Sequence, residues 1–355
     1  IWSTDGDGIQ SRWSDFVNIL WNKISFAGDD GIDVEGGDGV DVKGNTVKFS
    51  RNNGIEVTDA HGVDVSWNWV NGSGDDGVHI ERGGDVLVAY NNVSDSGHDG
   101  ISVADVYGYS GPAISVAKTE MSAPSSSLYN AKIIGNFVRD SGNHGIAAYE
   151  VPSILIAWNN VSNSGFFGGY DTLRSEGPSC SRGGDGIHVE VSDGARKGNS
   201  DVLVDIIGNW VANSGDDGID VDFTHQGRKG RDDGYDTKVM VMDVEEGDGY
   251  EEEPYVKNRV DINILANGVY NSRDDGIVVS LHGAGKGDSM DSGRESAPSG
   301  WLKGGPDGSH GHGITEINVL IARNVVNNPV DVYTPEISLY KTELPYFGSR
   351  GDGIE

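Results

Sequence analysis

The stretch DGIDVEGGDGVDVKGNTVKFSRN, residues 30–52, is followed without a gap by NGIEVTDAHGVDVSWNWVNGSGD, residues 53–75. The two segments align position by position, and the same 23-residue period covers residues 7–29 and 76–98. Each copy contains three short stretches of alternating apolar and polar residues, separated by Gly, Asn and Asp. This pattern is typical of brief, half-buried strands between tight turns. Three strands per repeat predict one coil of an all-β solenoid, in which each unit contacts only its neighbours.

After residue 98 the repeat continues with insertions, and three columns of recurring residues mark its register. A glycine column comprises Gly8, Gly31, Gly54, Gly77, Gly100, Gly145, Gly186, Gly218, Gly276 and Gly353. An asparagine column comprises Asn22, Asn45, Asn68, Asn91, Asn136, Asn159, Asn209, Asn267 and Asn324, and a serine column lies five residues later, from Ser50 to Ser272. We expect the glycines at turns that are left-handed or have no room for a Cβ. We expect the Asn and Ser side chains to form ladders along the axis.

The Asn-x-Val, Ser and Gly-Ile-x-Val elements of each coil resemble the right-handed parallel β-helix repeat family over nearly the whole chain. The resemblance implies a single-stranded right-handed parallel β-helix of about ten coils. We expect one domain over residues 1–355, with regular coils over 1–100 and loop-decorated coils over 101–355. Members of the family include polysaccharide lyases, hydrolases and uronan epimerases, but also fibre, adhesin and surface proteins. Fold alone therefore leaves the chemistry open.

The composition excludes several classes of protein. Asp and Glu number 56 against 26 Lys and Arg, a formal charge of −30, whereas a nucleic-acid binder needs a basic footprint. No apolar run is long enough to span a membrane. The lone Cys180 rules out an internal disulfide framework and a zinc site built from several thiolates. Because Asp-rich, Gly-rich turns are typical of exported repeats, we expect an extracellular or cell-surface protein.

The insertions lie mostly after Gly100, Gly186, Gly218 and Gly276, so long loops are predicted to leave one edge of the stack. They carry much of the basic charge of this acidic chain. A groove for an anionic glycan is one interpretation, with Arg182, Arg228 and Lys229 as substrate-binding residues. The other is that loops hold residues that a repeat cannot.

The strand after each Gly should expose its second and fourth residues, because Ile or Val occupies the first and third. Neighbouring coils then place on one patch the five candidate catalytic residues Tyr149, His188, Glu190, Asp220 and Asp222. His79 and Glu81 occupy the same two columns and are further candidates for substrate binding. His and Tyr suit acid–base chemistry on a uronate, whereas a hydrolase needs two carboxylates at a set separation. The alternative is that outward positions of any soluble strand are polar.

Pairs of acidic residues precede the glycine column and repel one another along the stack. We expect calcium as their counter-ion, because hard cations prefer carboxylate and carbonyl oxygens. The candidate ligands are Asp29, Asp30, Asp75, Asp76, Asp216, Asp217, Asp274 and Asp275. The open alternative is that solvated Asp caps the turns through its own side chain.

The sequence thus favours an exported β-helix protein that binds an acidic polysaccharide and that can act on it as a lyase or epimerase. Whether it is an enzyme stays open at this point, and glycoside hydrolysis is a third chemistry. The rival is a non-catalytic structural or adhesive solenoid, part of an extracellular fibre, filament or surface assembly, with end-to-end self-association through uncapped coil edges.

Overall fold

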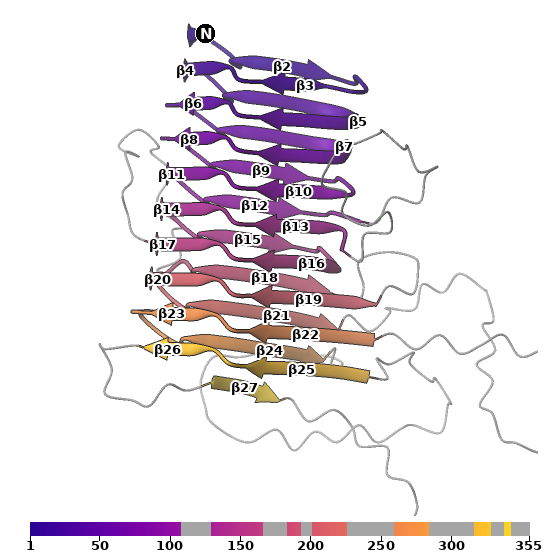
Figure 1. Ribbon diagram of the computed structural model, residues 1–355, viewed down its shortest axis with the longest axis vertical. Coiled ribbons are helices and arrows are strands. Elements are labelled where there is room, and N and C mark those ends of the chain that lie inside the picture. Colours follow the sequence, from indigo (N-terminus) through magenta and orange to yellow (C-terminus); the bar gives the residue numbers. More distant parts are fainter. Residues whose placement is uncertain are drawn as a thin grey trace, which may run out of the picture.

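The structure, a computed structural model, describes residues 1–107, 129–165, 183–192, 201–225, 259–283, 316–327 and 337–341. Every regular element among them is a β-strand, and the strands pair in parallel between successive coils, as in β5 with β7 and β18 with β21. The stack of coils in Figure 1 is a right-handed parallel β-helix, which confirms the predicted fold class. No helix in the described part of the chain has the length and apolar character needed to cross a membrane.

One sheet, called sheet A here, is built from the short strands at the left of Figure 1. Its order along the axis is β1 (Trp2–Thr4), β4 (Lys23–Ala27), β6 (Thr46–Lys48), β8 (Trp69–Asn71), β11 (Asn92–Ser96), β14 (Phe137–Ser141), β17 (Asn160–Ser164), β20 (Trp210–Ser214), β23 (Gly268–Tyr270) and β26 (Val325–Asn327). Because every coil contributes one strand, the sheet runs the length of the described stack.

The remaining strands form a sheet that bends around the core into two layers. We call them the front and the back layer, and these names do not refer to the view in Figure 1. The front strands are β2 (Ile9–Arg12), β9 (Val78–Glu81), β12 (Ile101–Ala104), β15 (Ile146–Tyr149), β18 (Ile187–Ser192), β21 (Ile219–His225), β24 (Ile277–Gly283) and β27 (Ile337–Lys341). The back strands are β3 (Asn18–Leu20), β10 (Val86–Ala89), β13 (Ala131–Ile134), β16 (Ser153–Ala157), β19 (Val202–Ile207), β22 (Arg259–Leu265) and β25 (Glu316–Ala322). Strands β5 (Ile32–Lys43) and β7 (Ile55–Ser66) run through both layers without a break.

The core is one apolar column enclosed by the three layers of strands. Ile187 pairs in register with Ile146 on one side and Ile219 on the other, and all three are fully buried. Isoleucine and valine fill most of it, since branched side chains pack well on a pleated surface. The prediction that the first and third residues of the front strands point inward is confirmed from β9 to β24, whereas the expectation that the second residues are exposed is wrong at, for example, Ser102 and Ala147, which are buried too.

The glycine column exists because there is no room for a side chain. A Cβ on Gly186 would lie 2.0 Å from Val211 Cγ1, 2.6 Å from the Gly218 carbonyl oxygen and 2.8 Å from Ser214 Oγ. None of the column glycines that the structure describes has a positive φ, so of the two expected reasons the missing Cβ is the correct one. The serines pack against these glycines. The hydroxyls of Ser96 and Ser141 have no hydrogen-bond partner among the described residues, so they do not form a bonded ladder.

The asparagine column forms the predicted ladder. Asn209 donates its backbone N–H to Asn267 Oδ1 at 2.8 Å, its side-chain amide to the same oxygen at 3.0 Å, and a second amide bond to the Ile156 carbonyl at 2.9 Å. The same three bonds recur at the other buried positions of the column, for example at Asn68. Each buried amide is therefore satisfied by the coils before and after it.

Replacing Ile187 with Ala is expected to lower the free energy of unfolding by about 2–5 kcal/mol, because it empties a fully buried aliphatic site. Leu203→Ala on β19, where the side chain is only partly buried, is the control and should cost far less. Urea unfolding followed by circular dichroism measures both. Equal losses in the two variants would contradict the assigned inward and outward positions.

Candidate functional site: two histidine–aspartate networks on the front face

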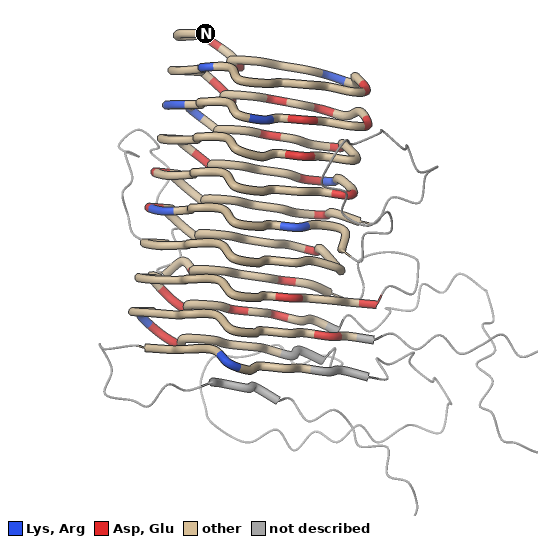
Figure 2. Tube along the Cα trace, in the orientation of Figure 1, with Lys and Arg blue, Asp and Glu red and all other residues tan. Residues whose placement is uncertain are grey.

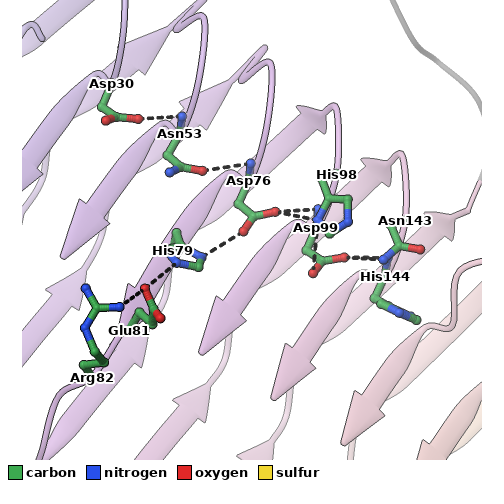
Figure 3. Close-up of polar contacts among 10 residues, drawn as sticks. All are labelled: Asp30, Asn53, Asp76, His79, Glu81, Arg82, His98, Asp99, Asn143 and His144. Carbon is green, nitrogen blue, oxygen red and sulfur yellow. Dashed lines mark hydrogen bonds and ion pairs between the residues drawn. The ribbon is translucent and has the colours of Figure 1, made fainter. Parts of the chain in front are cut away.

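The residue before each column glycine is a hydrogen-bond acceptor for the next coil. Asp30 Oδ1 accepts the backbone N–H of Asn53 at 2.7 Å, Asn53 Oδ1 that of Asp76 at 3.0 Å, and Asp76 Oδ1 that of Asp99 at 2.8 Å, as Figure 3 shows. The chain of bonds starts at Asp7 and ends at Asp275. We call these residues the acceptor column: Asp7, Asp30, Asn53, Asp76, Asp99, His144, Asp185, Asp217 and Asp275. Carboxylates are frequent in it because each position needs an acceptor, in addition to any role with cations.

His144 is the one imidazole in the acceptor column. Its Nδ1 accepts the backbone N–H of Asp185 at 3.0 Å, so it keeps the ladder intact while it adds a ring to the front face. The same Nδ1 lies 3.3 Å from Asp185 Oδ2.

His188 lies beside His144 and forms the first network with Asp185 and Asp220. The two imidazoles stack with centroids 4.6 Å apart, and His188 Nδ1 is 3.2 Å from Asp185 Oδ2 and 3.1 Å from Asp220 Oδ2. Burial alone would lower the pKa of His188, but the contacts with Asp185 and Asp220 outweigh it and raise that pKa to about 10. His188 is therefore an imidazolium at neutral pH, with its charge held on the front face.

Asp185 is the carboxylate that both imidazoles share. Burial favours its neutral form, but His144 and His188 outweigh that effect and lower the pKa of Asp185 to about 2. Asp185 stays ionised at any physiological pH, so it holds the imidazoles and cannot act as a proton donor.

The second network is centred on Asp76, three coils from Asp185 along the acceptor column, and is drawn in Figure 3. Asp76 contacts His79 Nδ1 through Oδ2 at 2.9 Å and His98 Nδ1 through Oδ1 at 3.0 Å. Contacts with Asp76 and Asp99 raise the pKa of His98 to about 11, and the two imidazoles, against the effect of burial, lower that of Asp76 to about 2. Asp99 is 1% exposed, and its Oδ2 has an ion-pair contact with His98 at 3.4 Å but no hydrogen bond among the described residues.

Tyr149 on β15 stands between the two networks. Its ring is 5.7 Å from that of His188. Burial, followed by the negative charges of Asp99, Asp76, Glu190 and Asp185, raises the pKa of the Tyr149 hydroxyl above its usual range. The phenol therefore keeps its proton at neutral pH and is available as an acid.

The structure brings the five predicted catalytic residues together on neighbouring front strands. Tyr149 pairs with Glu190 and Glu190 with Asp222, while His188 pairs with Asp220. The register read from the repeat therefore agrees with the structure at each position. No comparison tests their catalytic role.

The predicted substrate-binding residues are only partly placed. His79 and Glu81 lie on β9, where His79 Nε2 is 4.0 Å from Glu81 Oε2 and Glu81 pairs with Arg82 at 2.5 Å. Arg82 also contacts Asp59 at 3.0 Å. Arg182, Arg228 and Lys229 lie outside the described residues.

Four residues of the two networks were missed by sequence reasoning: His98, Asp99, His144 and Asp185. They lie in turns, and turn side chains were interpreted as caps or cation ligands. A signal for one of them was present, because His144 and Asn53 are the only residues in the described acceptor column that are not Asp, and both offer an acceptor atom.

The acidic turns form compact groups whose ligand atoms lie within 4.8 Å of one another: Asp7 with Asp29 and Asp30, Asp75 with Asp76 and His98, Asp216 with Asp217 and Asp274, and His144 with Asp185 and His188. Seven of the eight predicted calcium ligands thus belong to such a group, and the eighth, Asp275, donates its backbone N–H to Asp217 Oδ1. Asp and Glu positions recur along the stack in Figure 2. Calcium binding stays a prediction.

Residues 5–116 match the family model described as a right-handed beta helix region. No curated protein is matched by the sequence. Among solved structures, the periplasmic alginate epimerase AlgG is similar, with a TM-score of 0.34 and 12% identity over 79% of this chain and 50% of that one. This chain therefore spans about half the length of that structure, and so distant a likeness carries no argument about activity. The strand topology, together with this match over residues 5–116, shows a right-handed parallel β-helix fold.

Repulsion within the acidic turns predicts a pH dependence of stability. Burial, and then the charges of Asp185 and Asp220, raise the pKa of Asp217 to about 8. A carboxyl whose pKa is raised on folding weakens the fold as pH rises from its unfolded pKa, about 4, to about 8. Asp217→Asn keeps an acceptor for the Asp275 N–H, as Asn53 does in its own coil. In low salt without divalent cations we expect the variant to melt higher than wild type at pH 8 and at the same temperature near pH 4.

Asp185→Asn is the matched control from the same column, since it also keeps an acceptor but removes the partner of two imidazoles. It should melt lower than wild type at pH 7. Calcium at millimolar concentration should stabilise wild type more than Asp217→Asn if a cation binds at Asp216, Asp217 and Asp274. An identical calcium response in the two proteins would rule out that site, and a lower melting temperature of Asp217→Asn at pH 8 without calcium would contradict the repulsion.

Proposed function

We propose that this exported protein binds an acidic polysaccharide along the outer face of β9, β12, β15, β18 and β21 and modifies it at Tyr149, as a uronate lyase or C5 epimerase. The observation that supports this most is the position of Tyr149 between two histidine–aspartate networks. A protonated phenol next to an imidazolium offers an acid and a cation in one place, and Glu190 on the adjacent strand adds a carboxylate.

The chemistry of a uronate calls for these groups. Removal of the C5 proton pushes an electron pair toward the C6 carboxylate, and a nearby positive charge lowers the free energy of that intermediate. In the proposal His188, as an imidazolium, binds the carboxylate. Glu190 removes the proton. Tyr149 then donates a proton, either to the O4 leaving group of a lyase reaction or to C5 from the opposite face in an epimerase.

The other predicted residues take supporting roles in the proposal. Asp220 holds the His188 ring through Nδ1 and so positions it. Asp222, His79 and Glu81 extend the polar face to neighbouring coils, where further sugar residues would lie. Arg182, Arg228 and Lys229 are proposed to contact glycan carboxylates from the inserted segments, because the described front face is itself strongly acidic.

Glycoside hydrolysis is less well supported by the geometry. A hydrolase needs one carboxyl group that is protonated near neutral pH. Asp76 and Asp185 contact imidazoles and have their pKa lowered to about 2, so neither can act as that acid. Burial raises the pKa of Asp217 to about 8, but its carboxyl group accepts the Asp275 N–H in the acceptor column. The structural or adhesive solenoid, with end-to-end self-association, requires no acid–base group at all and is the alternative that an activity assay addresses.

The test is incubation with a panel of uronate-containing glycans, with ultraviolet absorbance reporting unsaturated ends and NMR reporting inverted C5 centres. Tyr149→Phe and His188→Gln are expected to lower turnover by about 10²–10⁴-fold, the usual contribution of a positioned acid or base. Tyr270→Phe, which also removes one phenol hydroxyl but lies on β23 of sheet A, is the matched control and should be fully active.

Tyr149→Phe should melt close to wild type, which separates loss of chemistry from loss of fold, whereas His188→Gln should melt lower because it also removes the ion pairs with Asp185 and Asp220. If wild type turns over no uronate glycan, or if Tyr149→Phe retains full activity, the catalytic proposal is wrong. Light scattering that shows fibres or end-to-end stacks of an inactive protein would then favour the structural solenoid.

A further inference from the structure

A line of exposed aromatic side chains follows the corner between the back strands and sheet A. Trp21 lies between β3 and β4, Trp67 between β7 and β8, Tyr90 between β10 and β11, and Trp158 between β16 and β17. They are 77%, 63%, 47% and 66% exposed, respectively. Large exposed aromatics that recur at one place on a surface are typical of binding sites rather than of chance. The front-face networks lie at the other end of the sheet A strands, so this line is separate from them.

The backbone of this corner favours glycine. Trp21, Trp67, Tyr90 and Trp158 have φ of 58°, 61°, 56° and 54°, a left-handed conformation that is strained for a bulky side chain. The equivalent turns at Gly44, Gly135 and Gly208 have φ of 66°, 65° and 66°. Glycine would relieve the strain at the aromatic positions too. Strain of this kind is a reason to look for a function.

The glycines hold the rings flat against the surface. A Cβ on Gly44 would lie 2.3 Å from Trp21 Cε3, and one on Gly208 would lie 2.8 Å from Trp158 Cδ1, so each ring covers the glycine of the following coil. Gly135 is covered in the same way by Tyr90, at 2.7 Å. One face of Trp21, Tyr90 and Trp158 therefore rests on the backbone, whereas Trp67 stacks on the Tyr90 ring with the two centroids 4.6 Å apart. Since most of Trp21 and Trp158 is exposed, their other face is open to solvent.

Sheet A extends this corner with alternating aromatic and amide side chains. Trp69, Asn92, Phe137, Asn160 and Trp210 follow one another in register along the axis. Lys48 Nζ lies 4.3 Å from the centre of the Trp69 ring and adds a positive charge. We call the corner residues Trp21, Trp67, Tyr90 and Trp158, together with Trp69, Phe137 and Trp210, the aromatic strip.

We propose that the aromatic strip is a second carbohydrate-binding surface, on which a polysaccharide chain runs along the axis of the solenoid. Open aromatic faces stack on the C–H faces of sugar rings, and amides bind their hydroxyls. Successive coils are about 4.8 Å apart, close to the length of one pyranose, so stacking sites recur in step with the sugars. The Asn side chains between the rings and the ammonium group of Lys48 beside Trp69 favour a ligand rich in hydroxyl and carboxylate groups over a second copy of this chain as the occupant.

The choice of an acidic polysaccharide as the ligand rests on the proposed function. The strip would hold a polymer while the front face acts on another part of it, which raises the effective concentration of the substrate. It should therefore matter for long chains and not for short ones.

The experiment compares wild type with Trp67→Ala/Trp158→Ala, using a long uronate polymer, a short oligosaccharide of the same sugar and a neutral polysaccharide as probes. Loss of two stacking platforms is expected to weaken binding of the long polymer by about tenfold or more, and to leave turnover of the oligosaccharide unchanged. Trp13→Ala is the matched control. Trp13 is 69% exposed with a φ of 50° and lies over Gly36, but it is outside the strip.

Polymer affinity of the double variant within about twofold of wild type would overturn the proposal, as would an equal loss in Trp13→Ala. If wild type binds the neutral polysaccharide through the strip and no uronate polymer, the strip stands and the proposed front-face function fails. If wild type binds no polysaccharide, both proposals are wrong. If the double substitution abolishes only self-association in light scattering, the strip proposal alone is wrong.

Discussion

The structure depends on hydrogen bonds that link side chains of one coil to the backbone of the next. Two columns make them along the axis: the asparagine ladder, as at Asn209 and Asn267, and the acceptor column, as at Asp76 and Asp99. Both satisfy turn N–H groups that no strand can reach, and an unpaired buried N–H is costly. With the apolar column inside, they fix the rise and register of successive coils. Outward side chains on adjacent strands consequently lie at set positions even though their coils are separated by insertions of different length.

This constraint also explains where the candidate site could arise. A column position tolerates any side chain that keeps an acceptor atom in place, and at His144 that side chain is an imidazole. The substitution leaves the ladder intact while it adds a ring that stacks on His188 and contacts Asp185. The carboxylates that serve the ladder elsewhere then hold imidazolium charge on the front face. Asp185 and His144 thus each accept a backbone N–H group of the next coil, and both also contact His188 close to Tyr149.

The repeat predicted the fold, the inward positions and the register of Tyr149, His188 and Asp220, because a parallel β-helix converts sequence spacing directly into position. It did not predict the networks. Those depend on the direction of turn side chains, which the period does not encode, and the acidic turns were interpreted mainly as cation ligands although Asp30 and Asp76 accept backbone N–H groups. The aromatic corner was missed for the same reason: its left-handed turns are visible only in the backbone. Arg182, Arg228 and Lys229 lie outside the described residues, so their predicted part in binding stays a prediction.

We infer that the acceptor column stabilises the fold, and that the imidazole of His144, at a position where most coils have Asp, contributes to catalysis. His144→Asp tests this claim most directly, because Asp is the residue that the other coils use as the acceptor. We expect the variant to melt within a few degrees of wild type, and to lose about a hundredfold or more of its turnover of a uronate glycan, because the ring that stacks on His188 is gone. Full activity together with an unchanged melting temperature would contradict the chemical half of the claim, and unfolding of the variant would contradict the structural half.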